Sequence, residues 1–504
     1  MKLGDLFADG LGALPQGAAD VDVRALAVDS RRAMPGALFA ALPGVHADGA
    51  QFAAEAARRG AAAVLAEKPL DVKIPVVVAG NARKAFSVAA SRFHGEPSRR
   101  LQLFGITGTN GKTTTAYLVE QLAARRGLAT GLIGTVESRW PGGRLPATHT
   151  TPESHELQEI LAKMADSGAE VVAMEVSSHA LAQERVAGCT FAGAAFTNLT
   201  RDHLDYHGTL DAYFEAKAKL FREQLPRGAT AVLNFDDPRV HGLAGSLPFA
   251  LGFTLQGAAG AALVATQLES SLRGLRFRLR TTTPLEPQVA EVESPLVGGH
   301  NAENLLAALG LLLGTGVPLS ELVRLVPEAP GAPGRLERVP DPSGRIVLVD
   351  YAHSPDALVR VLDAIRDAAG PGPKRVCVFG CGGDRDRGKR PLMGQAAAAG
   401  ANLVIATSDN PRTEDPLAIL GEIEPGLAAS LRKLEPWQAR EGAQGYVIEP
   451  DRSRAIHLAL ECSGHGDAVL IAGKGHEDYQ IVGKEKRPFD DRREARRAME
   501  ALRK

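Results

Sequence analysis

The chain has 504 residues, and at roughly 150 residues per domain this length predicts about three domains. Its 58 Lys and Arg and 59 Asp and Glu residues give a formal net charge of -1, which excludes a broad basic surface for nucleic acid or an anionic membrane. Hydrophobic residues make up 44% of the chain and aromatic residues 5%, which favours α/β domains packed by small aliphatic side chains over an aromatic-rich β-sandwich.

The cysteines and the N-terminal sequence indicate the redox and cellular setting. Cys189, Cys377, Cys381 and Cys462 make none of the paired spacings of a zinc site or a disulfide framework, so we expect reduced, buried thiols. The segment MKLGDLFADGLGALP has no apolar run long enough for a signal peptide or a membrane span. The sequence therefore predicts a cytoplasmic protein.

The first two domains are expected at residues 1–100 and 101–335. In the first, short apolar runs such as GALFAAL and IPVVVAG alternate with turns and Ala-rich stretches, which predicts a small α/β domain. The second begins with the predicted strand LQLFGIT, a glycine loop and a helix ending at Gly127. Further strands are expected at EVVAMEVSS, GAAFTN and TAVLN, with an apolar helix at LLAALGLLLGTG.

The third domain is expected at residues 336–504, after the Pro- and Gly-rich segment EAPGAPGRLERVPDPSG. Three apolar strands each run into a polar or glycine-bearing loop: RVCVFGCGGDRDRG, ANLVIATSDNPRTEDP and DAVLIAGKGHEDYQ. Ligands bind beyond the carboxyl ends of the strands in a doubly wound parallel sheet, so these loops are predicted to form one site.

The segment GITGTNGKTT, residues 105–114, lies between a predicted strand and a predicted helix. Such a loop aims backbone N–H groups and a helix N-terminus at phosphate, with Lys112 as a point charge and Thr113 as a Mg²⁺ ligand. It departs from the usual Walker spacing, because Ile106 stands where that pattern has its first glycine.

This loop resembles that of the Mur ligases and the folylpolyglutamate synthases, ATP-dependent enzymes that form amide bonds. Resemblance to the Mur ligase family then extends along the chain through DSR, HTTPE, MEVSSHAL, TRDHLDYHGT, YFEAKAKLF, GHNAEN, VDYAHSPDAL, CGGDRDRGKRP, DNPRTEDP and GKGHEDYQ. It implies three α/β domains: an N-terminal UDP-binding domain, a central ATPase-like domain with a parallel sheet, and a C-terminal Rossmann-like doubly wound domain.

The resemblance also implies an activity. The chain would be an ATP-dependent ligase that adds meso-2,6-diaminopimelate to the D-glutamate of UDP-N-acetylmuramoyl-L-alanyl-D-glutamate, through an acyl phosphate, in peptidoglycan precursor synthesis. It would act as a monomer on small molecules, with no nucleic-acid partner and no membrane insertion. Three alternatives stay open: an L-lysine-adding ligase, a folylpolyglutamate synthase, or a phosphate-loop NTPase switch that catalyses no ligation.

ATP and Mg²⁺ contacts follow from matching the family's motifs. The residues expected to bind ATP are Gly108, Thr109, Asn110, Gly111, Lys112, Thr113, Thr114, Asn301, Arg335 and Asp350. Those expected to hold metal ions are Thr113, Glu175, His203 and Lys217. Arg335 lies in the segment between the second and third domains, so closure of the third domain would bring its cation to the γ-phosphate.

Lys217 is singled out by helical periodicity as well as by the resemblance. Phe214, Lys217 and Phe221 share one apolar face, whereas Lys219 lies four residues from both Glu215 and Glu223, as a solvated lysine does. Periodicity alone allows Lys217 to extend its ammonium to solvent. Burial would instead favour the neutral amine, which can take up CO₂, and the resemblance implies an N-carboxylated Lys217 that acts as a metal ligand.

The two acceptor ends are also matched by motif. The muramoyl-dipeptide substrate is expected to contact Ser30, His46, Thr150, Thr151, Ser177, Gln183 and Arg185. Diaminopimelate is expected to contact Arg385, Asp409, Asn410, Pro411, Arg412, Gly473 and Glu477. His149 stands where the family often has Asn. Arg412 can bind a carboxylate bidentately, and diaminopimelate has a distal carboxylate that lysine lacks.

Overall fold

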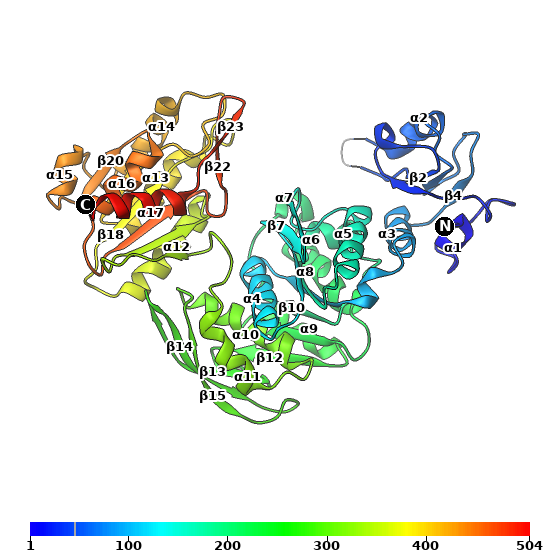
Figure 1. The fold of residues 1–504 in the computed structure, drawn as a ribbon, viewed down its shortest axis with the longest axis horizontal. Coiled ribbons are helices and arrows are strands. Elements are labelled where there is room, and N and C mark those ends of the chain that lie inside the picture. Colours follow the sequence, from blue (N-terminus) through cyan, green and yellow to red (C-terminus); the bar gives the residue numbers. More distant parts are fainter. Residues whose placement is uncertain (45–46, 504) are drawn as a thin grey trace. The chain divides into compact units, whose positions relative to one another are not determined.

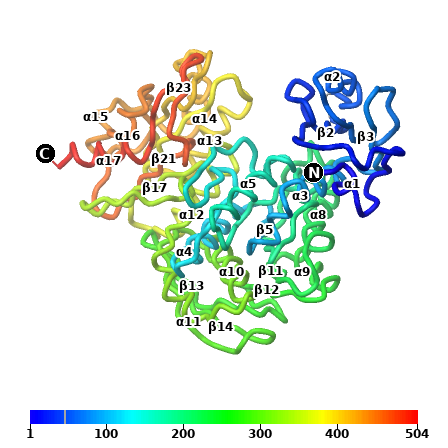
Figure 2. Tube along the Cα trace, turned by 45° about the vertical axis from the view of Figure 1, so that its right-hand side comes forward, coloured from blue at the N-terminus to red at the C-terminus, as the bar shows by residue number. Residues whose placement is uncertain are grey.

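The computed structural model describes residues 1–44 and 47–503. These residues form two compact units, one containing Met1–Val264, Thr281–Gln288 and Glu303–Pro318, the other containing Ala265–Arg280, Val289–Ala302 and Leu319–Lys504. Figures 1 and 2 trace the chain through an N-terminal, a central and a C-terminal α/β part, which confirms the predicted three-domain α/β class. The exact domain boundaries stay predictions.

The N-terminal part contains a parallel four-stranded sheet of order β1-β2-β3-β4. Its strands are β1 (Ala25–Ala27), β2 (Ala37–Ala40), β3 (Ala63–Ala66) and β4 (Val76–Val78). Its helices and 3₁₀ turns are α1 (Leu3–Leu6), η1 (Ser30–Arg32), η2 (Gly49–Phe52), α2 (Ala53–Arg58), α3 (Ala82–Phe93) and η3 (Pro97–Arg100). All residues of β2 and β3 are buried, as expected for strands covered on both faces.

The central sheet has the order β15-β14-β13-β12-β11-β10-β5-β9-β6-β7-β8. Its strands are β5 (Gln102–Thr107), β6 (Thr130–Ile133), β7 (Glu137–Trp140), β8 (Gly143–Pro146), β9 (Val171–Glu175), β10 (Gly193–Phe196), β11 (Thr230–Asn234), β12 (Ala250–Thr254), β13 (Leu263–Ser271), β14 (Gly274–Thr281) and β15 (Val289–Ser294). Pairing is parallel from β12 through β11, β10, β5 and β9 to β6. The carboxyl ends of these strands therefore lie at one edge.

Helical elements follow most of the parallel strands of this part. They are α4 (Lys112–Arg125), α5 (Ser154–Asp166), α6 (Ser178–Ala182), α7 (Leu204–His207), α8 (Leu210–Lys219), η4 (Leu220–Gln224), α9 (Pro238–Leu243), η5 (Ala244–Ser246), α10 (His300–Leu313), α11 (Leu319–Leu325) and η6 (Val326–Glu328). Among the described residues, no helix is long and apolar enough to cross a membrane.

The C-terminal part contains a six-stranded sheet of order β16-β17-β21-β18-β19-β20 and a separate β22-β23 hairpin. Its strands are β16 (Glu337–Val339), β17 (Ile346–Asp350), β18 (Arg375–Phe379), β19 (Leu403–Ala406), β20 (Gly445–Ile448), β21 (Ala468–Ala472), β22 (Tyr479–Val482) and β23 (Glu485–Pro488). Its helices are α12 (Pro355–Ala369), α13 (Lys389–Gly400), α14 (Pro416–Ala428), α15 (Pro436–Arg440), α16 (Arg452–Glu461) and α17 (Asp491–Ala501).

Both faces of this sheet are buried, as predicted for a doubly wound domain. Leu348 of β17 belongs to a core shared with α12, α13 and α14. Its neighbour Val347 points to the opposite face and belongs to a core shared with α16 and α17. The strands β17, β21, β18 and β19 are adjacent and parallel, so the three loops singled out by sequence do leave one edge together.

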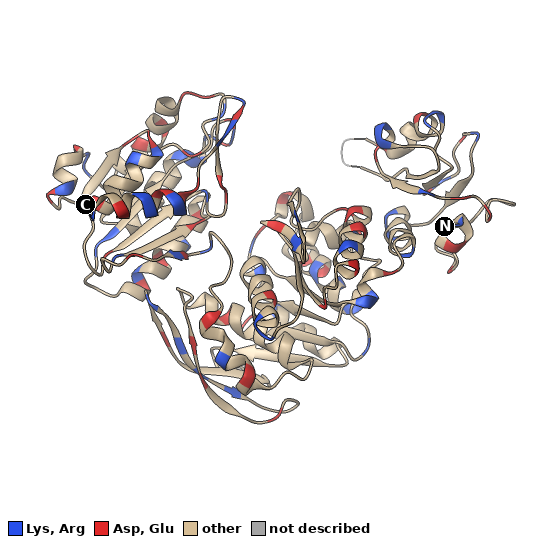
Figure 3. Cartoon of the chain, in the orientation of Figure 1, with Lys and Arg blue, Asp and Glu red and all other residues tan. Residues whose placement is uncertain are grey.

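Acidic and basic side chains are interspersed along both units, in agreement with the near-zero net charge (Figure 3). Glu303, in the first turn of α10, is an exception, because it is a largely buried acidic residue with other carboxylates nearby. Burial raises its pKa to about 7, and the Asp236 and Asp237 carboxylates add to the shift. Glu303 is therefore a carboxyl group that is better accommodated when protonated.

We expect Glu303→Gln to stabilise the chain in a pH-dependent manner. The pKa of Glu303 is raised from an ordinary 4.5, so the folded chain binds more protons. Stability is therefore lost as pH rises from 4.5 to about 7 and is level above that. The neutral amide avoids this loss, by on the order of 1–3 kcal/mol above pH 7.

Unfolding of both forms at several pH values measures the difference. The exposed Glu291→Gln on β15 is the control. A Glu303→Gln effect that does not change between pH 4.5 and pH 8 would contradict the assigned ionisation.

Candidate active site

The phosphate-type loop leaves the carboxyl end of β5 and leads directly into α4, as predicted. Gly108 and Gly111 have φ of +144° and +84°, which side-chain-bearing residues rarely adopt. A Cβ atom would lie 1.9 Å from Thr197 Oγ1 at Gly108 and 2.0 Å from Asn304 Oδ1 at Gly111. Glycine is required at both positions, because conformation and space each exclude a side chain.

The loop is held by the segment that follows the neighbouring strand β10. Asn198 accepts the N–H of Thr109 on its backbone oxygen and the N–H of Asn110 on its side-chain oxygen, both at 2.9 Å. The hydroxyl of Thr109 accepts the N–H of Thr200 at 2.9 Å. These residues were not predicted as part of the site. Their position directly after an apolar strand was the signal that could have found them.

Glu175, at the end of β9, accepts hydrogen bonds from a residue at the start of α4 and from a residue that follows β6. Its carboxylate is 1% exposed and accepts the Thr113 hydroxyl at 2.9 Å. It also accepts the N–H of Thr135 at 2.8 Å and the Thr135 hydroxyl at 3.1 Å. The structure thus brings the predicted metal ligands Thr113 and Glu175 together and adds Thr135, which follows β6.

Lys217 lies on the inward face that helical periodicity indicated, and its side chain is buried. It is 1% exposed, and its Nζ donates a hydrogen bond to Gly108 O at 2.7 Å and lies 4.5 Å from the centre of the Tyr213 ring. The Lys112 ammonium donates to the same carbonyl at 2.9 Å. Burial, and then the charge of Lys112, hold the pKa of Lys217 well below its usual range.

Lys219 does not have the predicted partners. Its Nζ lies 2.8 Å from Glu184 Oε1, while Glu215 pairs with Arg222 at 2.5 Å. The regular helix ends at Lys219 and continues as a π-helical turn. Lys219 is partly exposed, and its ion-pair partner is Glu184 of another segment.

His203 lies among aromatic rings near Lys217. Its ring centre is 4.8 Å from that of His179 and 6.2 Å from that of Tyr213, and its φ of +52° places it in the left-handed region. Within the described part of the chain, His, Cys, Asp and Glu form no group of three or more that could hold a metal ion. A metal site here would therefore need other oxygen donors.

The residues predicted to bind the muramoyl-dipeptide end form one hydrogen-bonded group in the central part. Arg185 donates to Thr151 O at 2.9 Å and to Gln183 Oε1 at 2.8 Å, and it pairs with Glu153 at 2.8 Å. The Thr151 hydroxyl accepts the N–H of Ser177 at 3.0 Å, and Thr150 contacts Thr135 through its hydroxyl at 3.1 Å. His149 is exposed.

Ser30 and His46 are the two predictions in the N-terminal part. Ser30 is buried, and its hydroxyl donates to Glu55 Oε2 at 2.8 Å. His46 lies outside the described residues. Among the described residues, Ser30 has its hydrogen bond to Glu55 and none to the Arg185 group.

Asn301, Arg335 and Asp350, the other predicted nucleotide contacts, belong to the second unit. Asn301, in the first turn of α10, donates to Val297 O at 2.8 Å, before the helix begins. The Arg335 guanidinium lies 5.1 Å from the centre of the Tyr351 ring. Asp350, at the end of β17, accepts the N–H of Leu336 at 2.7 Å and that of Ala352 at 2.8 Å, and burial raises its pKa. Asp350 thereby ties the segment that carries Arg335 to the sheet.

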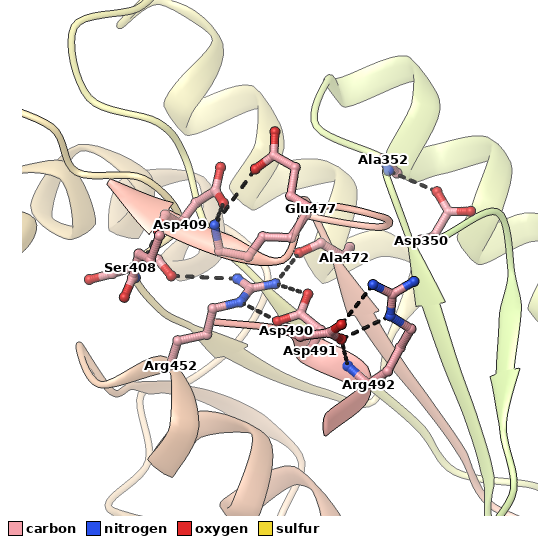
Figure 4. Close-up of polar contacts among 12 residues, drawn as sticks. Asp350, Ala352, Ser408, Asp409, Arg452, Ala472, Glu477, Asp490, Asp491 and Arg492 are labelled. Atoms are coloured by element: carbon pink, nitrogen blue, oxygen red, sulfur yellow. Dashed lines mark hydrogen bonds and ion pairs between the residues drawn. The ribbon is translucent and has the colours of Figure 1, made fainter. Parts of the chain in front are cut away.

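Two carboxylates of the predicted amino-acid site, Asp409 and Glu477, lie close together in the second unit (Figure 4). The side-chain amide of Asn410 donates to Glu477 Oε2 at 3.1 Å. Burial, and then the Asp409 carboxylate, raise the pKa of Glu477. Asp409 Oδ1 is buried and lies 3.3 Å from Lys474 Nζ. Two partly desolvated carboxylates thus share one ammonium, which leaves one negative charge for a cationic ligand.

The loops carrying Arg385 and Arg412 meet beside this group. Arg412 has φ of +51°, and its Nη1 donates a hydrogen bond to Gly383 O at 2.7 Å. The backbone oxygen of Asn410, the residue before Pro411, accepts the N–H of Gly383 at 2.9 Å. Arg385 is exposed on the loop that contains Gly383. Gly473, with φ of +113°, donates its N–H to Asp350 O at 3.0 Å.

Three family profiles cover most of the chain. "Mur ligase family, catalytic domain" matches residues 22–94, "Mur ligase middle domain" matches residues 106–312, and "Mur ligase, glutamate ligase domain" matches residues 334–475. These are the N-terminal, central and C-terminal parts of the fold.

Relatives and solved structures agree with these profiles. Proteins named UDP-N-acetylmuramoyl-L-alanyl-D-glutamate–2,6-diaminopimelate ligase are 47% identical in Parasynechococcus marenigrum, over 96% of both chains, and 45% identical in Geobacillus kaustophilus, over 95% of both. A solved structure with this name is 36% identical, with a TM-score of 0.74 over 100% of this chain and 99% of that one. A folylpolyglutamate synthase from Thermotoga maritima, 14% identical with a TM-score of 0.58 over 78% of this chain and 89% of that one, shares the fold. The chain belongs to the Mur ligase family.

Proposed function

We propose that this chain is an ATP-dependent ligase that joins meso-2,6-diaminopimelate to the D-glutamate of UDP-N-acetylmuramoyl-L-alanyl-D-glutamate. The observation that carries the proposal is the carboxyl edge of β10, β5, β9 and β6, where a glycine loop, Lys112, Glu175 and the buried Lys217 meet. The relatives' shared name supports the choice of acceptor and amino acid. We place the reaction in the cytoplasm.

The donor set at the end of β9 fits a hard divalent cation. The Thr113 hydroxyl and the Glu175 carboxylate are oxygen donors within 2.9 Å of each other, and Mg²⁺ prefers oxygen ligands. We propose that these residues hold one Mg²⁺, and that His203 with a carboxylated Lys217 holds a second. When bound, the ions would neutralise charge on the phosphoryl group in transfer.

ATP would bind with its phosphates at the glycine loop and the N-terminus of α4, with Thr109, Asn110 and Thr114 around them. The proposed nucleoside contacts remain Asn301 and Asp350, with Arg335 toward the phosphates. Lys112, whose Nζ lies 2.9 Å from the loop carbonyls of Gly108 and Thr109, would place its charge on the γ-phosphoryl group. Catalysis would then be positioning and electrostatics.

The chemistry has two bond-forming steps. The γ-carboxylate of D-glutamate attacks the γ-phosphorus of ATP, forming an acyl phosphate and releasing ADP. The amine of diaminopimelate attacks the acyl carbon, and the tetrahedral intermediate expels phosphate and loses a proton. We propose that Thr150, Thr151, Ser177, Gln183 and Arg185 hold the muramoyl-dipeptide near the first step, with Ser30 and His46 at the UDP end.

Selection of the amino acid is proposed to lie in the loops after β18, β19 and β21. Arg412 and Arg385 would bind carboxylates of diaminopimelate, and Asp409, Asn410 and Glu477 an ammonium group. Pro411 and Gly473 shape the loops that carry them. Lysine lacks the distal carboxylate, so it would leave a guanidinium unpaired.

An ADP-release assay with UDP-N-acetylmuramoyl-L-alanyl-D-glutamate and each amino acid in turn tests this function. We expect turnover with meso-diaminopimelate, at least 100-fold lower kcat/KM with L-lysine, and none without the UDP substrate. Equal use of lysine would refute the proposed specificity. ATP hydrolysis that is indifferent to both substrates would instead support a nucleotide switch.

Carboxylation of Lys217 is tested by its matched neighbour on the same helix. The neutral amine attacks CO₂ to form a carbamate, and the proton leaves to solvent. We expect Lys217→Ala to lower kcat by at least 100-fold and ¹³C-bicarbonate to give a carbamate signal that this variant lacks. Lys219→Ala, which removes only the partly exposed pair with Glu184, should stay within about threefold. An unmodified, dispensable Lys217 would sink the assignment.

Arg412→Ala should selectively impair use of diaminopimelate. Loss of a charge-assisted, bidentate contact costs about 1.5–3 kcal/mol, so we expect the KM for diaminopimelate to rise about 10–100-fold. The KM for ATP should stay within twofold. Arg496→Ala, at an exposed position of α17, is the control. An equal rise for lysine and diaminopimelate would show that Arg412 does not read the distal carboxylate.

A further inference from the structure

Lys474 is a fully buried lysine in the amino-acid site to which neither the sequence motifs nor the proposed mechanism gives a role. Its side chain is 0% exposed, and it follows β21 between Gly473 and Gly475. Its Nζ donates to Asn410 Oδ1 at 2.9 Å and to Tyr479 O at 2.8 Å. An ammonium has three donors, so one remains for the carboxylates nearby.

Those carboxylates are the two already assigned to the ligand. Lys474 Nζ lies 3.3 Å from Asp409 Oδ1 and 3.8 Å from Glu477 Oε2. One ammonium therefore faces two carboxylates, which leaves one negative charge in this group for a ligand ammonium to balance. Burial lowers the pKa of Lys474, whereas Asp409 opposes that shift.

Lys474 also fixes the orientation of the Asn410 amide. Asn410 Oδ1 accepts from Lys474 Nζ and from the N–H of Ile481, each at 2.9 Å. With its oxygen bound on that side, the amide must present Nδ2 to Glu477 Oε2, at 3.1 Å. The contact from Lys474 is thus passed through Asn410 to Glu477.

The strand ends beneath this group are held by a second buried charge. Arg452 and Asp491 are both 0% exposed and pair at 2.7 Å. Arg452 also donates to Ala472 O at 2.9 Å and to Ser408 O at 3.5 Å, the residues directly before Gly473 and Asp409 (Figure 4). Arg452 therefore holds the backbone next to both Asp409 and Lys474 in place.

We propose that Lys474 is a positioning residue for the amino-acid substrate: it orients Asn410 and Glu477 and balances one of two carboxylates, so that the other receives the ligand's ammonium. This inference rests on the proposed function. Lys474 itself does not touch the substrate; it acts through Asn410, Asp409 and Glu477.

The test is the KM of each substrate in Lys474→Met, which keeps the length of the chain and removes the charge. We expect the KM for diaminopimelate to rise at least 10-fold, with the KM values for ATP and the UDP substrate within twofold. Lys486→Met is the matched control, because Lys486 is exposed on β23 and lies 3.6 Å from the centre of the ring of Tyr479. A variant that lowers kcat for all substrates without this KM split would overturn the proposal.

A double-mutant cycle shows whether Lys474 acts through Asn410. If part of its effect runs through Asn410, Lys474→Met combined with Asn410→Ala should raise the KM for diaminopimelate by less than the product of the two single effects. Fully multiplicative effects would contradict the proposed route through Asn410. Should Lys474→Met not fold, ¹⁵N-lysine NMR of the wild-type chain replaces it: the Lys474 ammonium signal should shift with diaminopimelate and not with ATP, and no shift at saturation would overturn the proposal.

Failure of the proposed function is separable from failure of this inference. Wild-type turnover with diaminopimelate is measured first. If the wild-type chain uses another amino acid, the function is wrong, and the same KM split is measured with that amino acid. If it uses diaminopimelate and Lys474→Met keeps the wild-type KM, only the inference is wrong.

Discussion

Each of the two strand-end sites is built around a buried lysine ammonium, and the cost of removing that charge from water shapes what surrounds it. Lys217 and Lys474 are 1% and 0% exposed. Lys217 meets the carbonyl of Gly108 and, among the described residues, forms no ion pair with a carboxylate. Lys474 meets Asp409 and Glu477. Burial lowers the pKa of both lysines, but the carboxylates beside Lys474 oppose that shift, so the two side chains lie in different electrostatic surroundings.

The shared carboxyl edge of the parallel strands makes both sites possible, and this edge was predictable. Runs such as LQLFGIT and DAVLIAG are continuously apolar, as buried parallel strands must be, and the residues after them are polar. Parallel strands end at one edge. The sequence could therefore predict that Lys112 and Glu175 lie together in one unit, and Asp409 and Glu477 in the other. Their individual contacts could not, because strand order is not written in the pattern of a single strand.

The residues that were not predicted from the sequence support the glycine loop. Asn198 holds the glycine loop through Thr109 and Asn110, and Asn304 closes the space beside Gly111. Asn198 follows an apolar strand and Asn304 lies in α10, but neither position shows which loop residues it contacts, because those residues lie far away in sequence. At Lys219 the ion-pair partner is Glu184, which is 35 residues away in sequence. Helical spacing points to partners on the same helix and gives no sign of one on another segment.

Buried charge also explains how loops with little secondary structure can hold a selective geometry. Arg390, 0% exposed, pairs with Glu414 and Glu422, each at 2.8 Å, and so ties α13 to the segment that follows Arg412. Hydrophobic contacts fill space without fixing direction, whereas a buried guanidinium is satisfied only by acceptors at set angles. Removing one partner of such a pair leaves the other charge buried without compensation, which lowers the stability of the fold. The loops after β18, β19 and β21 are therefore restrained in orientation as well as in position, as the proposed choice between diaminopimelate and lysine requires.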